Sequence, residues 1–268
     1  MSWLNLDWQK TIVFIGKDNP KNFIGTGVLL GLSGIHHLAT AKHVIFDNNG
    51  DEKKSLFISF NSKKGEIIDR KIEDVKTQYK VDWITHKDSN VDIVLIPISI
   101  DIENDDVKLI SEDLFSNVVS DNLAEDVFFL GFQPGLSLTR VNPIIRSGII
   151  SRIEDDGIFY IDTTVFPGNS GSPVFLKPSF VNPFEGGTKL GFQHFGKFIG
   201  IVGAYIPYQE LAISQQTGNP RIIFEENTGI SVVWSVKKIQ EIISSKTFKE
   251  QIERLKGKNT DKETNSSN

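Results

Sequence analysis

The sequence contains no cysteine among its 268 residues. A disulfide framework, a thiolate metal site and a cysteine nucleophile are therefore excluded. Disulfides form and persist in oxidising compartments, so their absence favours a reducing one.

The sequence also lacks the marks of export or membrane insertion. Its first residues, MSWLNLDWQKTIVFIG, contain no basic segment, no long apolar segment and no small-residue cleavage site of the kind found in signal peptides. The most apolar stretch elsewhere, Ile93–Ile100, contains a proline and is too short to span a bilayer. We therefore expect a cytoplasmic protein that does not insert into membranes.

Positive charge is not in excess, because the formal net charge is −5. Nucleic-acid binding relies on a basic face that displaces counterions, so we expect no nucleic-acid partner. The apolar fraction of 39% is sufficient for a buried core, and the length suits one large or two small domains.

Short β-rich runs, separated by Gly, Asn, Asp and Pro, dominate the chain and predict an all-β fold. The expected strands are Thr11–Ile15, Gly27–Leu32, His37–Ala41, Ser55–Phe60, Val91–Pro97, Asp126–Gly131, Pro143–Ser151, Gly157–Asp162, Pro173–Leu176 and Phe198–Ala204. The polar stretch Asn104–Asn122 is expected to link two halves and to hold a short helix near Asp106–Phe115. No useful helical period is found before residue 230.

The C-terminal part has helical periodicity instead. Apolar residues recur at helical spacing from Val236 to Ile243, and Ser235 is placed to cap that helix. Thr247 and Glu250 have the spacing of a capping box for a second helix. We expect Gly257 to end it, and the polar residues that follow to be disordered.

Three segments carry residues suited to acyl-transfer chemistry. An apolar strand delivers His43, Asp92 opens another apolar strand, and Ser170 lies in a glycine-rich turn: the segments are LATAKHV (38–44), NVDIVLI (90–96) and FPGNSGSP (166–173). A serine hydroxyl needs a base to remove its proton, and a carboxylate keeps that imidazole base in the right tautomer. The flanking glycines let the N–H groups of Gly168 and Ser170 converge on one oxyanion.

In these segments the sequence resembles the trypsin-like serine peptidases, specifically the disulfide-poor bacterial branch that includes HtrA proteases and glutamyl endopeptidases. The resemblance covers roughly residues 10–245. Four further segments match the family in order: VFFLGFQP (127–134), RSGIIS (146–151), KFIGIVGA (197–204) and GISVVWSVKKIQEII (229–243).

The resemblance implies two six-stranded antiparallel β-barrels with a short C-terminal helical tail. The peptidase domain would span residues 1–245, with barrels at about 8–102 and 122–233, and the tail 246–268. The implied activity is a serine endopeptidase that needs no cofactor and acts on protein or peptide substrates.

The same resemblance assigns roles to individual residues. His43 would be the general base, Asp92 its orienting carboxylate and Ser170 the nucleophile, with oxyanion donors from Gly168 and Ser170. The family pattern also places Thr164 at the bottom of the S1 pocket. Val202 and Gly203 would pair with the substrate backbone.

Departures from the family pattern are informative. Family members made as zymogens have an aspartate before the serine that pairs with a newly cut N-terminus, whereas this chain has Asn169. Glutamyl endopeptidases carry a histidine in the cleft strand, where this chain has Val202. Only about 25 residues follow the closing helix, too few for a PDZ domain.

The rival hypothesis is a protease-fold binding module, either inactive or latent until a partner binds. Two long segments, Lys177–Phe198 and Ile206–Thr228, are expected to be mobile surface loops beside the cleft, where a regulatory protein partner would dock.

Other polar residues have ordinary interpretations. Asp82 and Asp88 compete with Asp92 for the role of orienting carboxylate. His36 and His37 point to opposite faces of a strand, so no metal site is expected from them. His86 and His194 lie in polar stretches and are expected to be solvated. The run Gly25–Gly27 is interpreted as a turn rather than a phosphate-binding loop.

Overall fold

Strands dominate the computed structural model, which describes residues 6–133, 140–178, 181–184, 187–190 and 196–265. Those of the first half are β1 (Ile12–Lys17), β2 (Asn19–Leu32), β3 (Ile35–Thr40), β4 (Leu56–Asn61), β5 (Ile67–Lys71), β6 (Ile84–Thr85), β7 (Val94–Pro97) and β8 (Ile110–Ser111). Those of the second half are β9 (Asp126–Gly131), β10 (Ile144–Ile153), β11 (Ile158–Asp162), β12 (Pro173–Leu176), β13 (Val181–Phe184), β14 (Gly187–Leu190), β15 (Phe198–Ile213) and β16 (Pro220–Ser235). The helices are α1 (Lys42–Ile45), α2 (Ile72–Tyr79), α3 (Val236–Ile243) and α4 (Lys246–Asn265), with 3₁₀ turns at Leu6–Thr11, Glu112–Leu114 and Ser120–Asn122.

The first half is a curved sheet around its own apolar interior. Its strands pair in the order β5-β4-β1-β2-β3-β7-β6, and β8 joins β2 in parallel. Period-two alternation sorts the side chains of β1, because Val13 and Ile15 face this interior while Ile12 and Phe14 face the other half.

The second half is a closed barrel in the order β10-β11-β16-β15-β12-β9. Val127 and Phe129 of β9 point into the barrel, whereas the alternate residues Phe128 and Leu130 point toward the first half. Each half therefore has its own core.

A third core joins the two halves and is rich in aromatic rings. Phe128 stacks on Phe175 with ring centroids 5.1 Å apart, and Trp8 packs edge-on against Phe175 at 4.6 Å. Val236 and Ile239 of α3 and Phe248 of α4 belong to the same cluster. Such extensive apolar contact holds the two halves in one arrangement, so a site built across them has a defined geometry.

The predicted all-β, chymotrypsin-like fold is confirmed. One difference concerns closure: strand pairing closes the second barrel, while the described strands of the first half form an open eight-stranded sheet. Each strand expected from the sequence is present, and Ser235 caps α3 by accepting a hydrogen bond from the N–H of Lys237.

Some local predictions were wrong. Helix α2 was not anticipated. The stretch expected to be helical near Asp106–Phe115 contains β8 and only a short 3₁₀ turn. The run Gly25–Gly27 lies inside β2 rather than in a turn, and α4 continues past Gly257 to Asn265.

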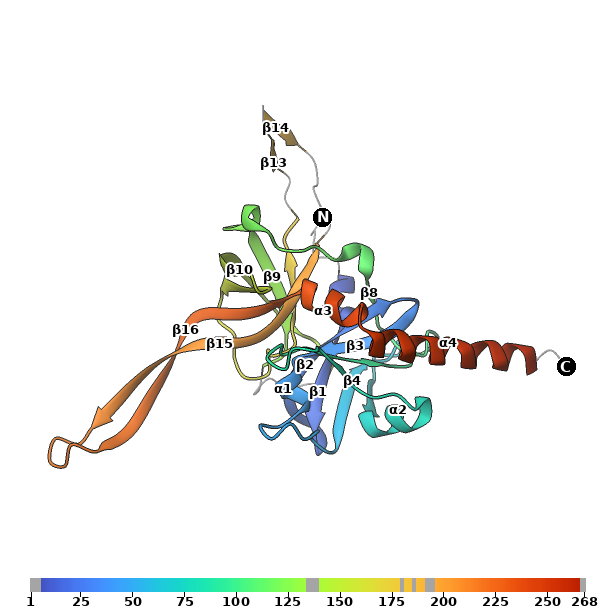
Figure 1. Cartoon of the computed structure of the whole chain (residues 1–268), viewed down its shortest axis with the longest axis horizontal. Helices are drawn as coiled ribbons and strands as arrows, with labels where there is room; N and C mark the ends of the chain where they lie inside the picture. The colour runs from blue at the N-terminus through green and yellow to red at the C-terminus, as the bar shows by residue number, and fades with distance from the viewer. Residues whose placement is uncertain (1–5, 134–139, 179–180, 185–186, 191–195, 266–268) are drawn as a thin grey trace.

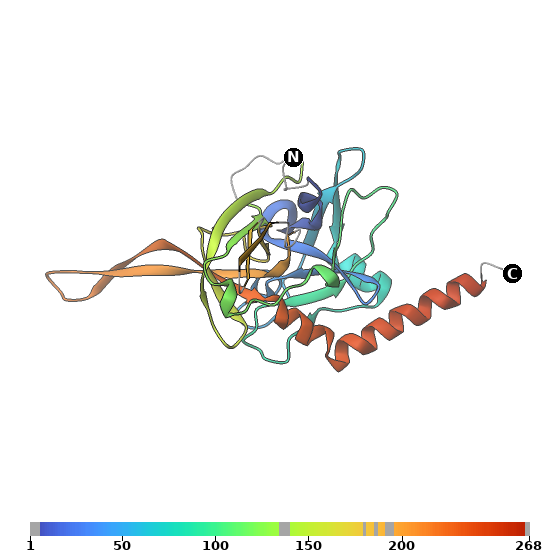
Figure 2. The ribbon, with the colours of Figure 1, turned by 90° about the horizontal axis from the view of Figure 1, so that it is seen from above.

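Two elements project from the body in opposite directions (Figures 1 and 2). One is α4. The other is the arm, which we define as Ile206–Thr228, the outer part of the β15–β16 hairpin. This segment was expected to be a mobile loop, but it is a two-stranded ribbon whose register runs from Pro207–Asn227 to Ile213–Pro220. No helix within the described residues is long and apolar enough to cross a membrane.

Candidate functional site

Strand pairing brings His43 and Asp92 together. Strands β3 and β7 are antiparallel, with Thr40 opposite Val94, so the end of β3 lies beside the start of β7. His43 follows β3 in the one-turn helix α1, and Asp92 precedes β7. A bond from the Lys42 N–H to the Asp92 carbonyl, 3.2 Å, ties the two segments together.

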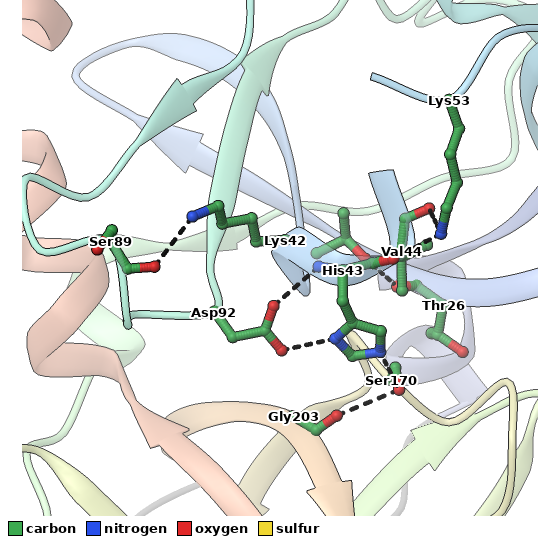
Figure 3. A network of polar contacts seen from close by, with 10 residues as sticks. Thr26, Lys42, His43, Val44, Lys53, Ser89, Asp92, Ser170 and Gly203 are labelled. Carbon is green, nitrogen blue, oxygen red and sulfur yellow. Dashed lines mark hydrogen bonds and ion pairs between the residues drawn. The ribbon is translucent and has the colours of Figure 1, made fainter. Parts of the chain in front are cut away.

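His43, Asp92 and Ser170 form one hydrogen-bonded row (Figure 3). The Asp92 carboxylate accepts two bonds from His43: Oδ1 from the backbone N–H at 2.8 Å and Oδ2 from Nδ1 at 2.7 Å. On the other side of the ring, Nε2 lies 2.9 Å from the Ser170 hydroxyl oxygen. That oxygen is also 3.2 Å from the Gly203 carbonyl oxygen of β15. With Nδ1–H bound to the carboxylate, Nε2 is free to accept a proton from Ser170.

The turn that carries Ser170 comes from the second half and is anchored to the first half by Thr26. The N–H of Thr26 donates to the Ser170 carbonyl at 2.9 Å, and its hydroxyl donates to the Gly168 carbonyl at 2.9 Å. Thr26 was not identified from the sequence. The available signal was its two glycine neighbours within a strand, since glycine there often marks a close backbone approach.

Glycine is required on both sides of Ser170. Gly168 and Gly171 have φ of +97° and +89°. A Cβ on Gly171 would lie 1.9 Å from the backbone oxygen of Thr26, and one on Gly168 would lie 2.1 Å from the Phe23 ring. This backbone leaves the N–H groups of Gly168 and Ser170 without an acceptor among the described residues. Both are therefore available to a bound oxyanion.

The side chain of Asn169 stabilises this turn through two hydrogen bonds. Its side chain is buried, its amide donates to the Phe132 carbonyl at 2.6 Å, and its Oδ1 accepts from the Phe166 N–H at 2.9 Å. Both bonds are internal to the second half and neutral. The turn is therefore fixed without a charged partner.

The three expected substrate-binding residues differ in their surroundings. Thr164 is half-buried, and its hydroxyl oxygen would lie 4.0 Å from a Cβ added to Gly229 of β16. Its place at the bottom of an S1 pocket stays a prediction. Val202 does not fit the role of pairing with a substrate backbone. Its N–H donates to Ser172 and its carbonyl accepts from the Gly171 N–H, so both groups are engaged inside the barrel. Gly203, one residue further along, contacts Ser170 directly.

The row of His43, Asp92 and Ser170 is partly exposed to solvent. The side chain of His43 is 52% exposed and that of Asp92 23%. The Lys53 ammonium donates to the carbonyls of His43 and Val44, at 2.6 and 3.3 Å, and so supports α1. Burial, with a smaller contribution from nearby Lys17, lowers the pKa of Lys53. No sequence pattern points to a role for this lysine.

The two rival aspartates lie elsewhere. Asp82 pairs with Lys76 at 2.8 Å, and the Asp88 carboxylate accepts from the Asn90 N–H in a local turn. Neither contacts His43 in the described structure, which leaves Asp92 as the carboxylate beside the imidazole.

Two of the other histidines, His37 and His86, are buried and contact residues outside the candidate site. His37 is fully buried and stacks on Phe248, with ring centroids 5.2 Å apart, and burial lowers its pKa to about 4. His86, expected to be solvated, is buried and bonded to Glu241 at 2.7 Å. His194 lies outside the described residues. No group of three or more potential metal-ligating side chains occurs in the described ranges.

Comparison with known proteins indicates the family of this chain. A family model described as a trypsin-like peptidase domain matches residues 25–178, a span that includes His43, Asp92 and Ser170. Comparison with curated protein sequences gives no significant match.

Solved structures, among them two serine proteases, share the fold. A serine endoprotease from Yersinia pestis is similar over 90% of this chain at 16% identity, with a TM-score of 0.50; this chain spans 64% of its length. The thermostable serine protease AL20 from an extremophilic microorganism is similar over 88% of this chain and 96% of its own, at 11% identity and a TM-score of 0.51. A mutant of human heparin-binding protein (CAP37) matches 87% of this chain and 89% of its own, at 10% identity and a TM-score of 0.54. At these identities the likeness is one of fold.

Proposed function

The chain belongs to the trypsin-like peptidase family, and we propose that it is a serine endopeptidase that cleaves peptide bonds through His43, Asp92 and Ser170. The observation that carries the proposal is the row of hydrogen bonds from Asp92 Oδ2 through the His43 ring to the Ser170 hydroxyl. Nucleophile, base and orienting carboxylate stand in the order that this chemistry needs.

In the proposed reaction, the Ser170 oxygen attacks the carbonyl carbon of the scissile bond while its proton passes to His43 Nε2. The Asp92 carboxylate stabilises the imidazolium that forms. His43 then gives the proton to the leaving amine, and the acyl group remains on Ser170 as an ester. Water, deprotonated by the same imidazole, releases the acid and restores the hydroxyl.

The negative charge of each tetrahedral intermediate would be held by the N–H groups of Gly168 and Ser170. Donors fixed before the reaction stabilise developing charge without reorganisation, and such stabilisation is often the largest contribution to the rate. Thr164 would contact the side chain on the acyl side of the scissile bond. It carries no charge, which favours small or medium uncharged side chains there.

Labelling with an alkyl fluorophosphonate tests the proposal directly. The expected result is one covalent adduct on Ser170, cleavage of test peptides at internal bonds, and loss of both in a folded Ser170→Ala variant. No adduct, together with no cleavage of any peptide in a library, would support the binding-module hypothesis instead. Peptide cleavage that persists in Ser170→Ala would remove Ser170 from the mechanism.

A further inference from the structure

The arm is the most unusual apolar surface of the molecule. Six large apolar side chains on it, Tyr208, Leu211, Ile213, Ile222, Ile223 and Phe224, are each between 50% and 62% exposed. An aromatic side chain offers roughly 150–250 Å² of surface and Leu or Ile somewhat less, so the six together expose on the order of 600 Å². Exposed apolar side chains that gather on one projecting element, rather than being scattered singly, often mark an interaction site.

Both faces of the ribbon take part. Cross-strand partners share a face, so Leu211 lies beside Ile223 on one face, and Ala212 beside Ile222 on the other. On the second face Phe224 is opposite Glu210. An isolated two-stranded hairpin is marginally stable in water, so a ribbon with apolar side chains on both faces gains stability when it is covered.

The arm is continuous with the candidate active site. Strand β15 carries Gly203, whose carbonyl oxygen is 3.2 Å from the Ser170 hydroxyl, and then runs without interruption to Ile213. Beyond residues 198–201, which pair with β12, the only neighbour of β15 among the described strands is β16. Among the described strands, the other edge of β15 is therefore unpaired along the arm, which projects away from the body (Figure 1).

We propose, on the basis of the proposed peptidase function, that the arm binds the protein substrate itself. It would hold an extended, apolar segment about five to ten residues on the amino-terminal side of the scissile bond. Tyr208 and Ile213 stand five and ten residues beyond Gly203, which is about 16 and about 33 Å at roughly 3.3 Å per residue of extended chain.

The amino-terminal side follows from the chemistry. His43 protonates the leaving amine, so the carboxyl-terminal product departs on the side of His43. The acyl half stays on Ser170, whose hydroxyl oxygen lies beside Gly203 of β15, and would therefore be the half that β15 holds. Pro207 has no N–H and limits backbone pairing along the arm, so the side chains beyond it provide the specificity.

Area and charge favour this occupant over a second copy of the chain. One face of the arm offers about half of its exposed apolar area, or about 300 Å², whereas a stable dimer buries about 800 Å² per partner. Glu210, Glu225 and Glu226 outnumber Arg221, the one basic residue of the arm. Pairing two arms would bring these acids together, while a neutral or basic substrate segment would complement them.

Two matched peptide series test the inference. Long fluorogenic peptides carry Leu, Ile and Phe, or Ser and Gly, at positions five to ten before the scissile bond. Short peptides stop four residues before it and keep the same bond. For the wild-type protein, we expect kcat/KM of the apolar long peptides to exceed that of the polar long peptides about tenfold or more, mainly through KM.

The variant Leu211→Ser/Ile223→Ser/Phe224→Ser should abolish this advantage and leave short-peptide cleavage unchanged. Ile102→Ser is the matched control, because Ile102 is a highly exposed apolar residue outside the arm, and it should retain the advantage. In a second variant an Asn-Gly turn replaces residues 208–226 and joins the paired residues Pro207 and Asn227. This second variant should also lose the advantage for apolar long peptides. It gives an independent test if the triple variant does not keep its hairpin.

The outcomes separate the two proposals. If wild-type protein reacts with the fluorophosphonate and cleaves short peptides, but cleaves apolar and polar long peptides equally, the arm inference is wrong and the peptidase function stands. If it neither reacts nor cleaves, both are wrong. If wild-type protein is a dimer by light scattering, and the arm variants are monomers with unchanged peptide selectivity, the arm is a self-association surface and the inference is wrong.

Discussion

Replacing Gly168 by alanine should impair catalysis far more than folding. The φ of this residue is +97°, and an added Cβ would lie 2.1 Å from the Phe23 ring. That ring is itself fixed, since it stacks on Phe14 at 4.5 Å and meets Phe132 edge-on. The 167–168 peptide must therefore turn, which moves the Gly168 N–H away from the oxyanion. Loss of one such donor costs about 10²–10³ in kcat, or about 3–4 kcal/mol.

The assay compares the rate of fluorophosphonate labelling and kcat for a short peptide with the free energy of unfolding in urea. Gly34→Ala is a matched control, because Gly34 has φ of +81° but nothing within 4 Å of an added Cβ. It should lose about 1–2 kcal/mol of stability from the left-handed backbone and keep its activity. Adding Phe23→Ala to Gly168→Ala removes the crowding and should restore part of the labelling rate. A folded Gly168→Ala variant that labels at the wild-type rate would refute the assignment of Gly168 as an oxyanion donor.

Three other changes have definite expectations. Asp92→Asn should lower kcat about 10⁴-fold with little effect on folding, because the amide no longer holds the required His43 tautomer; wild-type kinetics in a folded variant would contradict the role of Asp92. Thr164→Asp should raise kcat/KM for peptides with Arg or Lys on the acyl side of the bond, since a carboxylate at the pocket floor pairs with a basic side chain; an unchanged library profile would place the pocket elsewhere. Burial lowers the pKa of His37 to about 4 from 6.5, so below pH 6.5 the unfolded chain binds a proton that the folded chain excludes. Stability should fall by about 2 kcal/mol from pH 7.5 to pH 5 in urea titrations, and this loss should be absent in His37→Phe; parallel pH profiles of the two proteins would show that His37 is not responsible.

The meeting of His43, Asp92 and Ser170 was predictable because each has a strong local signature. His43 and Asp92 flank apolar strands, and once those strands pair antiparallel their ends must meet. Ser170 lies between glycines that the observed backbone requires. The supporting contacts are different in kind. Thr26 bonds to Gly168 across 142 residues of sequence. The glycines on either side of Thr26 indicate a close backbone approach, but they do not indicate which distant segment approaches.

The arm and α2 escaped prediction for opposite reasons. In α2 only Ile72 and Val75 are buried, so the helical period is too short to stand out from the surrounding polar residues. The arm has strong β-forming residues, but apolar side chains occur on both of its faces. Its pattern therefore does not alternate as that of a half-buried strand does, and its Gly, Pro and Gln content suggested a loop. A strand is predictable from sequence when burial of one face makes its apolar residues alternate. The arm is largely exposed, so its sequence lacks that pattern.

Asn169 bears on how activity at this site would be regulated, because its side chain stabilises the turn that carries Ser170. A buried aspartate at this position would need a cationic partner, because an unpaired carboxylate in such surroundings is costly. Asn169 instead satisfies its amide with the Phe132 carbonyl and the Phe166 N–H, both within the same half of the protein. These two bonds hold the turn without a charged partner for residue 169. For the peptidase proposed above, we therefore expect control to act on which polypeptides reach Ser170. The arm, continuous with the strand beside that serine, is the element that we propose selects them.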